Sequence, residues 1–256
     1  MTHLPDGFLK APFAHRGYHN AANGCVENTR AAFVAAIDAG YGIELDVQLS
    51  SDGHAMVFHD YDMTRLTGNA GPIRMQRRDD LTKTNLIGCS EPIPTLPEIL
   101  TLIDGRVPVL IEIKDQDGAM GPDVGPLEDS VAHALKDYSG PAAVMSFNPH
   151  AVAALAKSAP DTARGLVTGS FPADVWLLLN EKTLDHLRGI PDYHRVGASF
   201  ISHRFDDLQR ERVAELKSAG AALICWTIRS AIDEAEARKL ADTVTFEGYV
   251  AETPVG

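Results

Sequence analysis

The chain has 256 residues, of which 45% are hydrophobic and 23% charged, enough for one large α/β domain or two small ones. Its formal net charge of −12 argues against nucleic acid or an anionic membrane surface as a partner, because both require a positive face. Three widely spaced cysteines without a CxxC pair argue against a disulfide framework and a zinc cluster. A small-molecule partner remains open, including an anion held by a few cations or a metal.

Short apolar runs alternate with stretches of helical periodicity along most of the chain. Eight strands are expected, at residues 12–16, 42–49, 107–114, 142–147, 164–168, 196–202, 222–228 and 243–247. Helices are expected between them, and the clearest are at residues 27–40, 148–160, 206–220 and 230–242. Gly40 is expected to end the first of these helices, and Asn148 and Pro149 to begin the second.

Eight strands that alternate with helices over about 250 residues are typical of a (β/α)8, or TIM, barrel. A doubly wound sheet is the rival α/β architecture, but the chain has no GxGxxG or GxxxxGK[ST] phosphate loop. Residues 60–95 interrupt the alternation after the second strand, and they are polar and rich in turn residues. We therefore expect residues 1–256 to form one TIM-barrel domain with a small insertion at 60–95.

Two of the expected strands carry charged side chains, which are costly to bury. Glu44 and Asp46 are two residues apart and therefore share one face of their strand. Glu112 and Lys114 repeat this arrangement one βα unit later. An ion pair between Asp46 and Lys114 would explain one such strand, but both lie near the carboxyl ends, where a barrel holds its active site. Glu44, Asp46 and Glu112 together predict an oxygen-only site for one divalent cation, Mg²⁺ or Ca²⁺.

Two of the ten histidines, His15 and His59, each end a strand whose top is expected to face the same cavity. Two histidines suit the roles of general acid and general base near neutral pH. Arg16 offers a planar fork for a phosphate or a carboxylate, and an ion pair with Glu27 is its structural alternative.

Several short motifs follow one another in a fixed order, from His15 to about Pro254: HRG…ENT, ELDV, DG, VFHD, TG, PTL, EIK, SF and WT. This set resembles the glycerophosphodiester phosphodiesterase family. Single motifs are weak, but the aspartate of ELDV thirteen residues before HD, with EIK later, is highly specific. The resemblance implies a TIM barrel with a small insertion after the second strand.

The resemblance also implies roles for the candidate residues. The three carboxylates would hold the cation, the two histidines would be the acid–base pair, and five further residues would contact the substrate: Arg16, Lys114, Asn28, Phe147 and Trp226. Arg16 and Lys114 would hold the phosphate, and Asn28 would lie near the site. Phe147 and Trp226 would line the pocket against the glycerol or the leaving group. The alternatives are a helix-start role for Asn28 and core packing for the two aromatic residues.

The chain departs from the family pattern at several positions. Cys25 and Val26 precede ENT where the family usually has proline. Glu247 and Glu252 stand where the family tends to have aspartates, and Arg229 where it often has asparagine. None of these is an expected metal, acid–base or phosphate residue, so they bear on the leaving group and not on the reaction.

We therefore expect a metal-dependent hydrolase that converts glycerophosphodiesters to glycerol 3-phosphate and an alcohol. A lipid phosphodiesterase of the phospholipase C or sphingomyelinase D type is an alternative, and it needs an exposed apolar lip. A catalytically inactive binding barrel is another. The insertion favours a soluble head group over a lipid, with an anionic lipid as the alternative, because it carries basic residues: Arg65, Arg74, Arg77, Arg78 and Lys83.

The sequence also carries expectations about location. The first residues lack a basic segment followed by an apolar run, and no stretch approaches the roughly 18 apolar residues that a membrane span needs. We therefore predict a cytoplasmic protein that acts on a small molecule, without stable membrane insertion and without nucleic acid. No motif indicates the oligomeric state.

Overall fold

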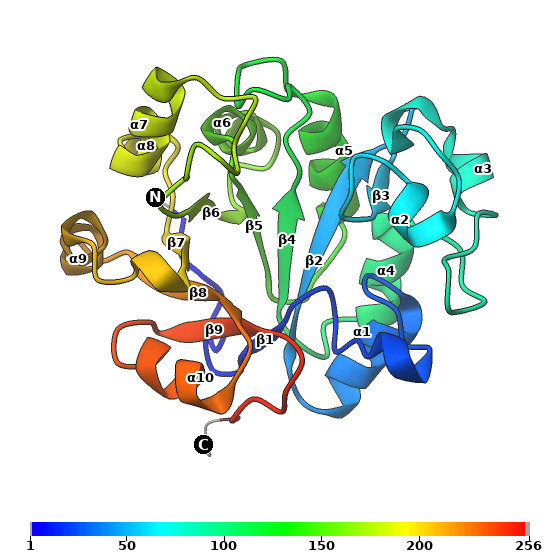
Figure 1. The fold of residues 1–256 in the computed structure, drawn as a ribbon, viewed down its shortest axis with the longest axis horizontal. Helices are drawn as coiled ribbons and strands as arrows, with labels where there is room; N and C mark the ends of the chain where they lie inside the picture. The colour runs from blue at the N-terminus through cyan, green and yellow to red at the C-terminus, as the bar shows by residue number, and fades with distance from the viewer. Residues whose placement is uncertain (1, 254–256) are drawn as a thin grey trace.

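The computed structural model describes residues 2–253, so the expected end of the family match at Pro254 lies outside the described residues. Eight parallel strands form a closed ring, in which β1 pairs with both β2 and β9 (Figure 1). They are β1 (Phe13–Ala14), β2 (Gly42–Leu49), β4 (Val109–Ile113), β5 (Ala142–Ser146), β6 (Ala163–Thr168), β7 (Phe200–Arg204), β8 (Ala222–Ile228) and β9 (Thr243–Phe246). The predicted TIM barrel is confirmed.

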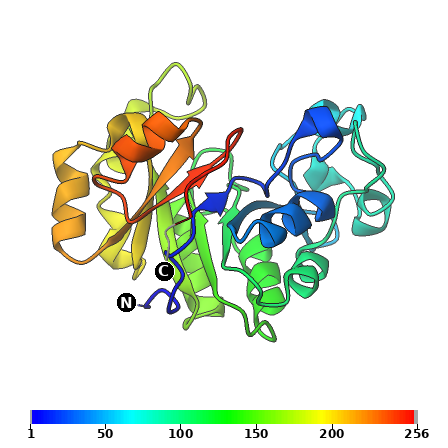
Figure 2. The same ribbon diagram turned by 90° about the horizontal axis from the view of Figure 1, so that it is seen from below.

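Helices surround the ring, with α9 and α10 on one side and α1 on the other (Figure 2). Those that follow or precede barrel strands are α1 (Arg30–Asp38), α4 (Leu96–Ile103), α5 (Pro126–Leu135), α6 (Pro149–Ser158), α7 (Glu181–Gly189), α8 (Asp192–Arg195), α9 (Glu211–Ser218) and α10 (Ala231–Ala237). Among the described residues, no helix is both long enough and apolar enough to cross a bilayer.

Side-chain caps explain where several helices begin. The Asn148 side chain accepts the backbone N–H of His150, and Pro149 is the first residue of α6, as predicted. The cap of α1 is Thr29, which accepts the N–H of Ala32. The helix-start role considered for Asn28 is therefore wrong, and a φ of +56° keeps Asn28 outside the helix.

One predicted strand is displaced. The apolar pattern placed it at residues 196–202, whereas β7 runs from Phe200 to Arg204. The reason is local, because α8 ends at Arg195 and Gly197, two residues later, turns the chain with a φ of +63°. Pairing with β6 starts only where Phe200 lies opposite Gly165.

The expected insertion follows a short hairpin. β3 (Ala55–Val57) pairs antiparallel with β2 outside the ring, as the tight turn after β2 indicates. Residues 60–95 then contain α2 (Thr64–Thr67), the 3₁₀ helix η2 (Ile73–Met75) and α3 (Arg78–Leu81). Their apolar side chains form a cluster of their own with the hairpin: Met56, Phe58, Met63, Leu66, Ile73, Leu81, Leu86 and Ile93. This packing holds the insertion beside the end of β2 (Figure 1).

Alternation along the strands divides the core into two parts. Ile43, Leu45 and Val47 of β2 pack in the layer between strands and helices. The side chains between them point into the ring, where large apolar residues fill one end: Phe8, Phe13, Leu110, Phe200 and Ile224. Glycine makes room for the rings, since a Cβ on Gly165 would lie 2.4 Å from Phe200. At the other end of the ring, buried charged side chains such as Glu44, Asp46 and Glu112 lie beside apolar ones such as Met145 and Val167.

Candidate active site

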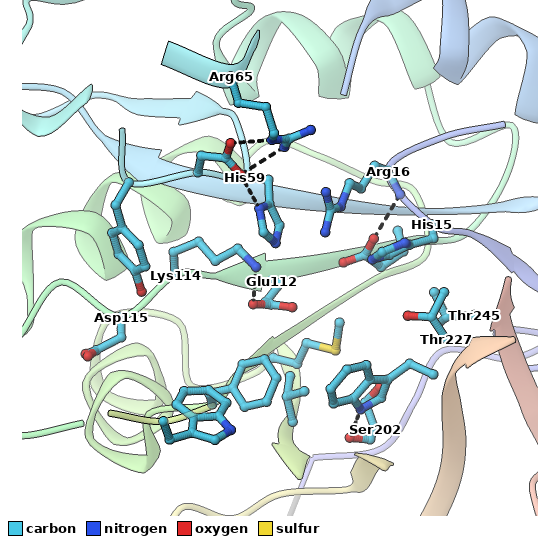
Figure 3. Close-up of a pocket in the computed structure, with 18 of the residues that line it drawn as sticks. His15, Arg16, His59, Arg65, Glu112, Lys114, Asp115, Ser202, Thr227 and Thr245 are labelled. Atoms are coloured by element: carbon cyan, nitrogen blue, oxygen red, sulfur yellow. Dashed lines mark hydrogen bonds and ion pairs between the residues drawn. The ribbon is translucent and has the colours of Figure 1, made fainter. Parts of the chain in front are cut away.

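A cavity of about 900 Å³ opens at the carboxyl ends of the barrel strands (Figure 3). Charged side chains line one half, among them His15, Arg16, Glu44, His59, Glu112 and Lys114. Apolar side chains line the other half: Met120, Met145, Phe147, Val167, Trp176 and Trp226. A TIM barrel brings ligands to this end of its strands, so the cavity is the candidate active site.

Strand register brings the three carboxylates together. In the parallel pair β2–β4, Asp46 lies opposite Glu112, and Glu44 is two residues before Asp46 on the same face. All three side chains are buried, and each offers an oxygen within 4.8 Å of the oxygens of the other two. Oxygen ligands at such spacing fit a hard divalent cation.

Two cations already contact this group. Lys114 Nζ lies 2.8 Å from an Asp46 oxygen and 2.6 Å from a Glu112 oxygen, so the ion pair considered from the sequence is present. Arg16 Nε lies 3.5 Å from Asp46. Lys114, His59 and Arg16 hold the pKa of Asp46 well below its ordinary value, although its burial acts in the opposite direction.

Glu44 is different from the other two carboxylates. It accepts a hydrogen bond from the backbone N–H of Arg16 at 3.0 Å, and no Lys or Arg side chain of the described residues forms an ion pair with it. Burial, together with the charges of Asp46 and Glu112, raises the pKa of Glu44 well above its ordinary value. The charged form of Glu44 therefore lacks a cationic partner among the described residues of this buried site, and a metal ion beside it would supply one.

Asn28 contacts this group from behind. Its Nδ2 donates to Asp46 at 3.0 Å, and its Oδ1 accepts the backbone N–H of Asp46 at 3.4 Å. The side chain is buried and is not among those that line the cavity. Asn28 therefore orients a carboxylate, and its predicted contact with substrate stays a prediction.

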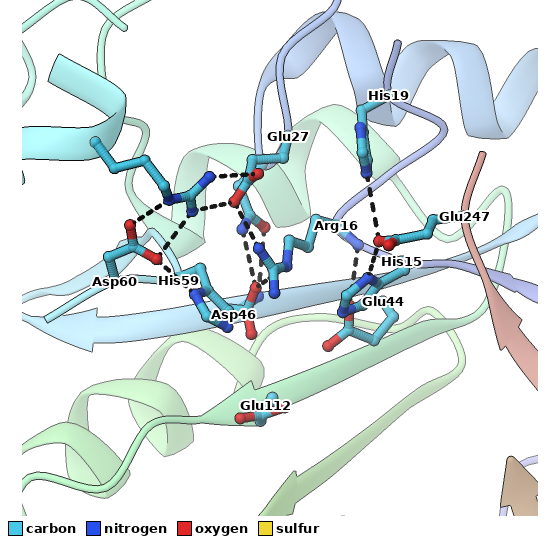
Figure 4. A network of polar contacts seen from close by, with 12 residues as sticks. His15, Arg16, His19, Glu27, Glu44, Asp46, His59, Asp60, Glu112 and Glu247 are labelled. Carbon is cyan, nitrogen blue, oxygen red and sulfur yellow. Dashed lines mark hydrogen bonds and ion pairs between the residues drawn. The ribbon is translucent and has the colours of Figure 1, made fainter. Parts of the chain in front are cut away.

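His15 is held by a carboxylate from the far end of the chain. Its Nδ1 lies 2.5 Å from Glu247 (Figure 4), and Glu247 in turn contacts Arg229 at 2.6 Å. With Nδ1 engaged, Nε2 is the nitrogen left to exchange a proton with a ligand. Burial lowers the pKa of His15 below its ordinary value, and the Glu247 carboxylate opposes that shift.

His59 has a similar arrangement built from its own neighbourhood. Its Nδ1 lies 2.7 Å from Asp60, and Arg65 contacts Asp60 at 2.6 Å. Burial lowers the pKa of His59, and the charge of Asp46 opposes the shift. Each histidine is thus a two-step relay of imidazole, carboxylate and arginine. Figure 4 shows the contacts of His15 with Glu247 and of His59 with Asp60.

Arg16 is fixed by the same network. Its Nη1 donates to Glu27 at 2.8 Å, so the predicted ion-pair alternative is present. Glu27 also accepts from both terminal nitrogens of Arg65, at 2.9 and 2.8 Å. Arg16 nevertheless lines the cavity. Its Nε is buried and lies 3.5 Å from Asp46 without forming a hydrogen bond among the described residues, so the side chain stays close to the carboxylates while it borders the cavity.

The apolar half of the cavity is a packed aromatic wall. Phe147 and Trp226 meet edge to face with ring centroids 5.5 Å apart, and both line the cavity. Trp226 Nε1 donates to the Ser202 carbonyl at 2.9 Å, which fixes the indole. Core packing and pocket lining are thus not exclusive for these two residues, and their contact with substrate stays a prediction.

Comparison with known proteins places the chain in a family. A family model described as the glycerophosphoryl diester phosphodiesterase family matches residues 15–245. The chain belongs to this family. A glycerophosphodiester phosphodiesterase from Caldanaerobacter subterraneus subsp. tengcongensis is 35% identical over 225 residues, which are 84% of each chain. The resemblance in the motifs is confirmed, and so is the prediction of an enzyme of the phosphoric diester hydrolase class.

Solved structures share the fold. A phosphodiesterase from Oleispira antarctica, in complex with the product sn-glycerol-3-phosphate, aligns with a TM-score of 0.74 at 23% identity, over 95% of this chain and 93% of its own. A glycerophosphodiester phosphodiesterase from Thermotoga maritima aligns with a TM-score of 0.69 at 22% identity, over 92% and 94%. These likenesses support the barrel and its closure.

Sequence reasoning missed the residues behind the two histidines. Asp60 stands directly after His59 in the HD motif, and adjacency could have suggested the contact. Glu247 and Arg229 were noticed only as separate departures from the family pattern, yet they form one ion pair. Because Arg229 and Glu247 follow the adjacent strands β8 and β9, their opposite charges could have indicated the contact.

Proposed function

We propose that the chain hydrolyses glycerophosphodiesters to glycerol 3-phosphate and an alcohol, and that the reaction depends on one divalent cation, Mg²⁺ or Ca²⁺. The observation that carries the proposal is the poorly compensated Glu44 in a buried group of three carboxylates. Two histidines with engaged Nδ1 atoms line the same cavity. Membership of the family supports the reaction class.

Glu44, Asp46 and Glu112 would hold the cation, with Asn28 fixing the orientation of Asp46. When bound, such an ion supplies positive charge against the non-bridging oxygens of the phosphate. Arg16 and Lys114 would bind the same oxygens from the protein side. Both side chains line the cavity, and Lys114 lies between Asp46 and Glu112.

The histidines would move the protons. One takes a proton at Nε2 from the attacking hydroxyl, and the other gives a proton to the departing alcohol oxygen, each contributing about 10² to 10⁴ in rate. The attacking group is water or the neighbouring hydroxyl of the glycerol. The family resemblance favours the glycerol hydroxyl, which has already lost the entropy of approach and gives a cyclic phosphate that water opens.

The test is hydrolysis of glycerophosphocholine and glycerophosphoethanolamine, with the phosphate product identified by ³¹P NMR. We expect glycerol 3-phosphate as the product, loss of turnover in EDTA and recovery on addition of Mg²⁺ or Ca²⁺. Full activity in the chelator would reject the metal. No turnover of a broad panel of diesters with Mg²⁺, Mn²⁺ and Ca²⁺ would instead favour an inactive binding barrel. Cell fractionation tests the predicted cytoplasmic location.

A further inference from the structure

The apolar half of the cavity reaches the protein surface at the loop between β6 and α7. Val175, Leu177 and Leu178 in this loop are 64%, 81% and 82% exposed. Trp176, in the middle of the same run, lines the cavity. We call residues 175–178 the apolar lip. Single exposed apolar residues are ordinary, but a consecutive group at the mouth of a catalytic cavity is a candidate binding surface.

The lip stands on a packed base. The Trp176 ring packs against Phe147 and Phe171, with centroids 5.2 and 5.3 Å apart. Its backbone N–H donates to the Pro172 carbonyl at 3.1 Å, and its carbonyl accepts the N–H of Leu179 at 3.0 Å. These contacts hold Trp176 toward the cavity, while the two leucines that follow it in the chain are exposed to solvent.

The cavity has room for more than a head group. Its volume of about 900 Å³ is near the upper end of the roughly 300–1,000 Å³ of pockets that enclose drug-sized ligands. The charged half accounts for the phosphate and its surroundings. The aromatic half, which runs from Met145 through Phe147 to Trp176, would face water beside a small polar diester. An uncharged chain on the substrate would cover this wall and remove apolar surface from water.

The charges nearby restrict the class of ligand. Asp174 and Glu181 flank the lip and are exposed, and the whole chain has a net charge of −12. An anionic lipid surface is therefore disfavoured at this mouth. The basic residues of the insertion do not offset this, because three of them already contact carboxylates: Arg65, Arg77 and Arg78. Since these arginines are already paired, they are also a weaker argument for a soluble head group.

We propose that the site takes glycerophosphodiesters that carry one uncharged hydrocarbon chain, such as single-chain glycerophospholipids, and that the apolar lip binds this chain. The inference rests on the proposed function. A substrate with one acyl chain on glycerol still has a hydroxyl next to the phosphate, so either route of attack is open to it. Hydrolysis breaks the bond between phosphorus and the head-group oxygen. Water supplies a proton to that oxygen and a hydroxyl to phosphorus, leaving acylglycerol phosphate and the free alcohol.

The experiment compares glycerophosphocholine with 1-dodecanoyl-glycerophosphocholine, kept below its critical micelle concentration. It uses the full chain and the variant Leu177→Ser/Leu178→Ser. We expect the wild type to favour the dodecanoyl substrate by about tenfold or more in kcat/KM, and the double variant to lose most of this preference through a higher KM, because two large apolar contacts are removed. Ile232→Ser, at a residue 79% exposed on α10, is the matched control and keeps the preference.

Failure of this inference is distinguishable from failure of the proposed function. Turnover of glycerophosphocholine with no gain from the chain, or a gain that the double variant keeps, overturns the inference alone. No turnover of either diester overturns both. Two further results would assign the lip elsewhere and reject the substrate chain as its occupant. One is binding to phosphatidylcholine vesicles, and the other is a dimer in solution, each lost in the double variant without any preference for the dodecanoyl substrate.

Discussion

The two histidines of the site are held alike but are built differently. His59 takes its carboxylate from the next residue, whereas His15 takes its carboxylate from Glu247, 232 residues away. The His15 side chain is 14% exposed and that of His59 is 31% exposed. Similar relays can therefore arise from adjacent residues in the sequence or from closure of the barrel. Only the relay of adjacent residues can be recognised from the sequence.

The two relays also end differently. Behind His59, Arg65 joins Asp60 to Glu27, and Glu27 holds Arg16, so this relay is continuous with the expected phosphate site. Behind His15, Arg229 contacts Glu247, and its side chain is 64% exposed. Substitutions behind His59 should therefore weaken substrate binding as well as affect His59. Substitutions behind His15 should affect only the proton transfer at His15.

The largest expected effect is loss of either imidazole. His15→Ala and His59→Ala should each lower kcat by about 10² to 10⁴, because each removes one proton transfer. Steady-state kinetics on glycerophosphocholine, with circular dichroism to check folding, provide the measurement. Near wild-type turnover in either variant would show that this histidine transfers no proton in the reaction, and that the two relays do not have equivalent roles.

A smaller effect is expected from the carboxylates, and it separates the two relays by pH. Both carboxylates raise the pKa of their histidine, so Glu247→Gln and Asp60→Asn should each lower it. The hydrogen bond that His15 donates to Glu247 is the main influence raising the pKa of His15, whereas Asp60 acts on His59 less strongly than Asp46 does.

In the pH profile of kcat, the limb that belongs to His15 should therefore move to lower pH in Glu247→Gln by more than the His59 limb moves in Asp60→Asn. NMR titration of the labelled imidazoles assigns each limb. Equal shifts, or a shift to higher pH, would contradict the difference between the relays.

The smallest effects are expected from the arginines, since Arg65 and Arg229 are 49% and 64% exposed and such ion pairs contribute little by themselves. Arg65→Met should raise KM several-fold, because Glu27 and with it Arg16 lose a partner, by analogy with other residues that orient ligands. Arg229→Met should change kcat within a few-fold and leave KM as it is, because Arg229 contacts only the Glu247 carboxylate behind His15. A rise in KM in Arg229→Met alone would reverse the comparison.

Local patterns were sufficient for much of the fold. Short apolar runs located the barrel strands, because parallel strands are buried on both faces. The two-residue repeat of a strand placed Glu44 and Asp46 on one face, and Glu112 and Lys114 repeated the arrangement one βα unit later. The apolar pattern misplaced β7, where the start of pairing depended on the turn at Gly197 and on contact with β6. The sequence predicted the helix cap at Asn148. It did not predict the cap at Thr29, because the neighbouring Asn28, which binds Asp46, was the considered helix-start residue.

By itself, the sequence determined the barrel, the order of its motifs and the residues that carry charge into it, because these follow from periodicity and residue type. Only the tertiary structure decided which partners those residues have. Closure of β1 against β9 brings Glu247 to His15, and folding of the insertion brings Arg65 to Glu27. The tertiary structure also decided that Leu177 and Leu178 are exposed, because the sequence of an apolar run does not show whether other residues cover it.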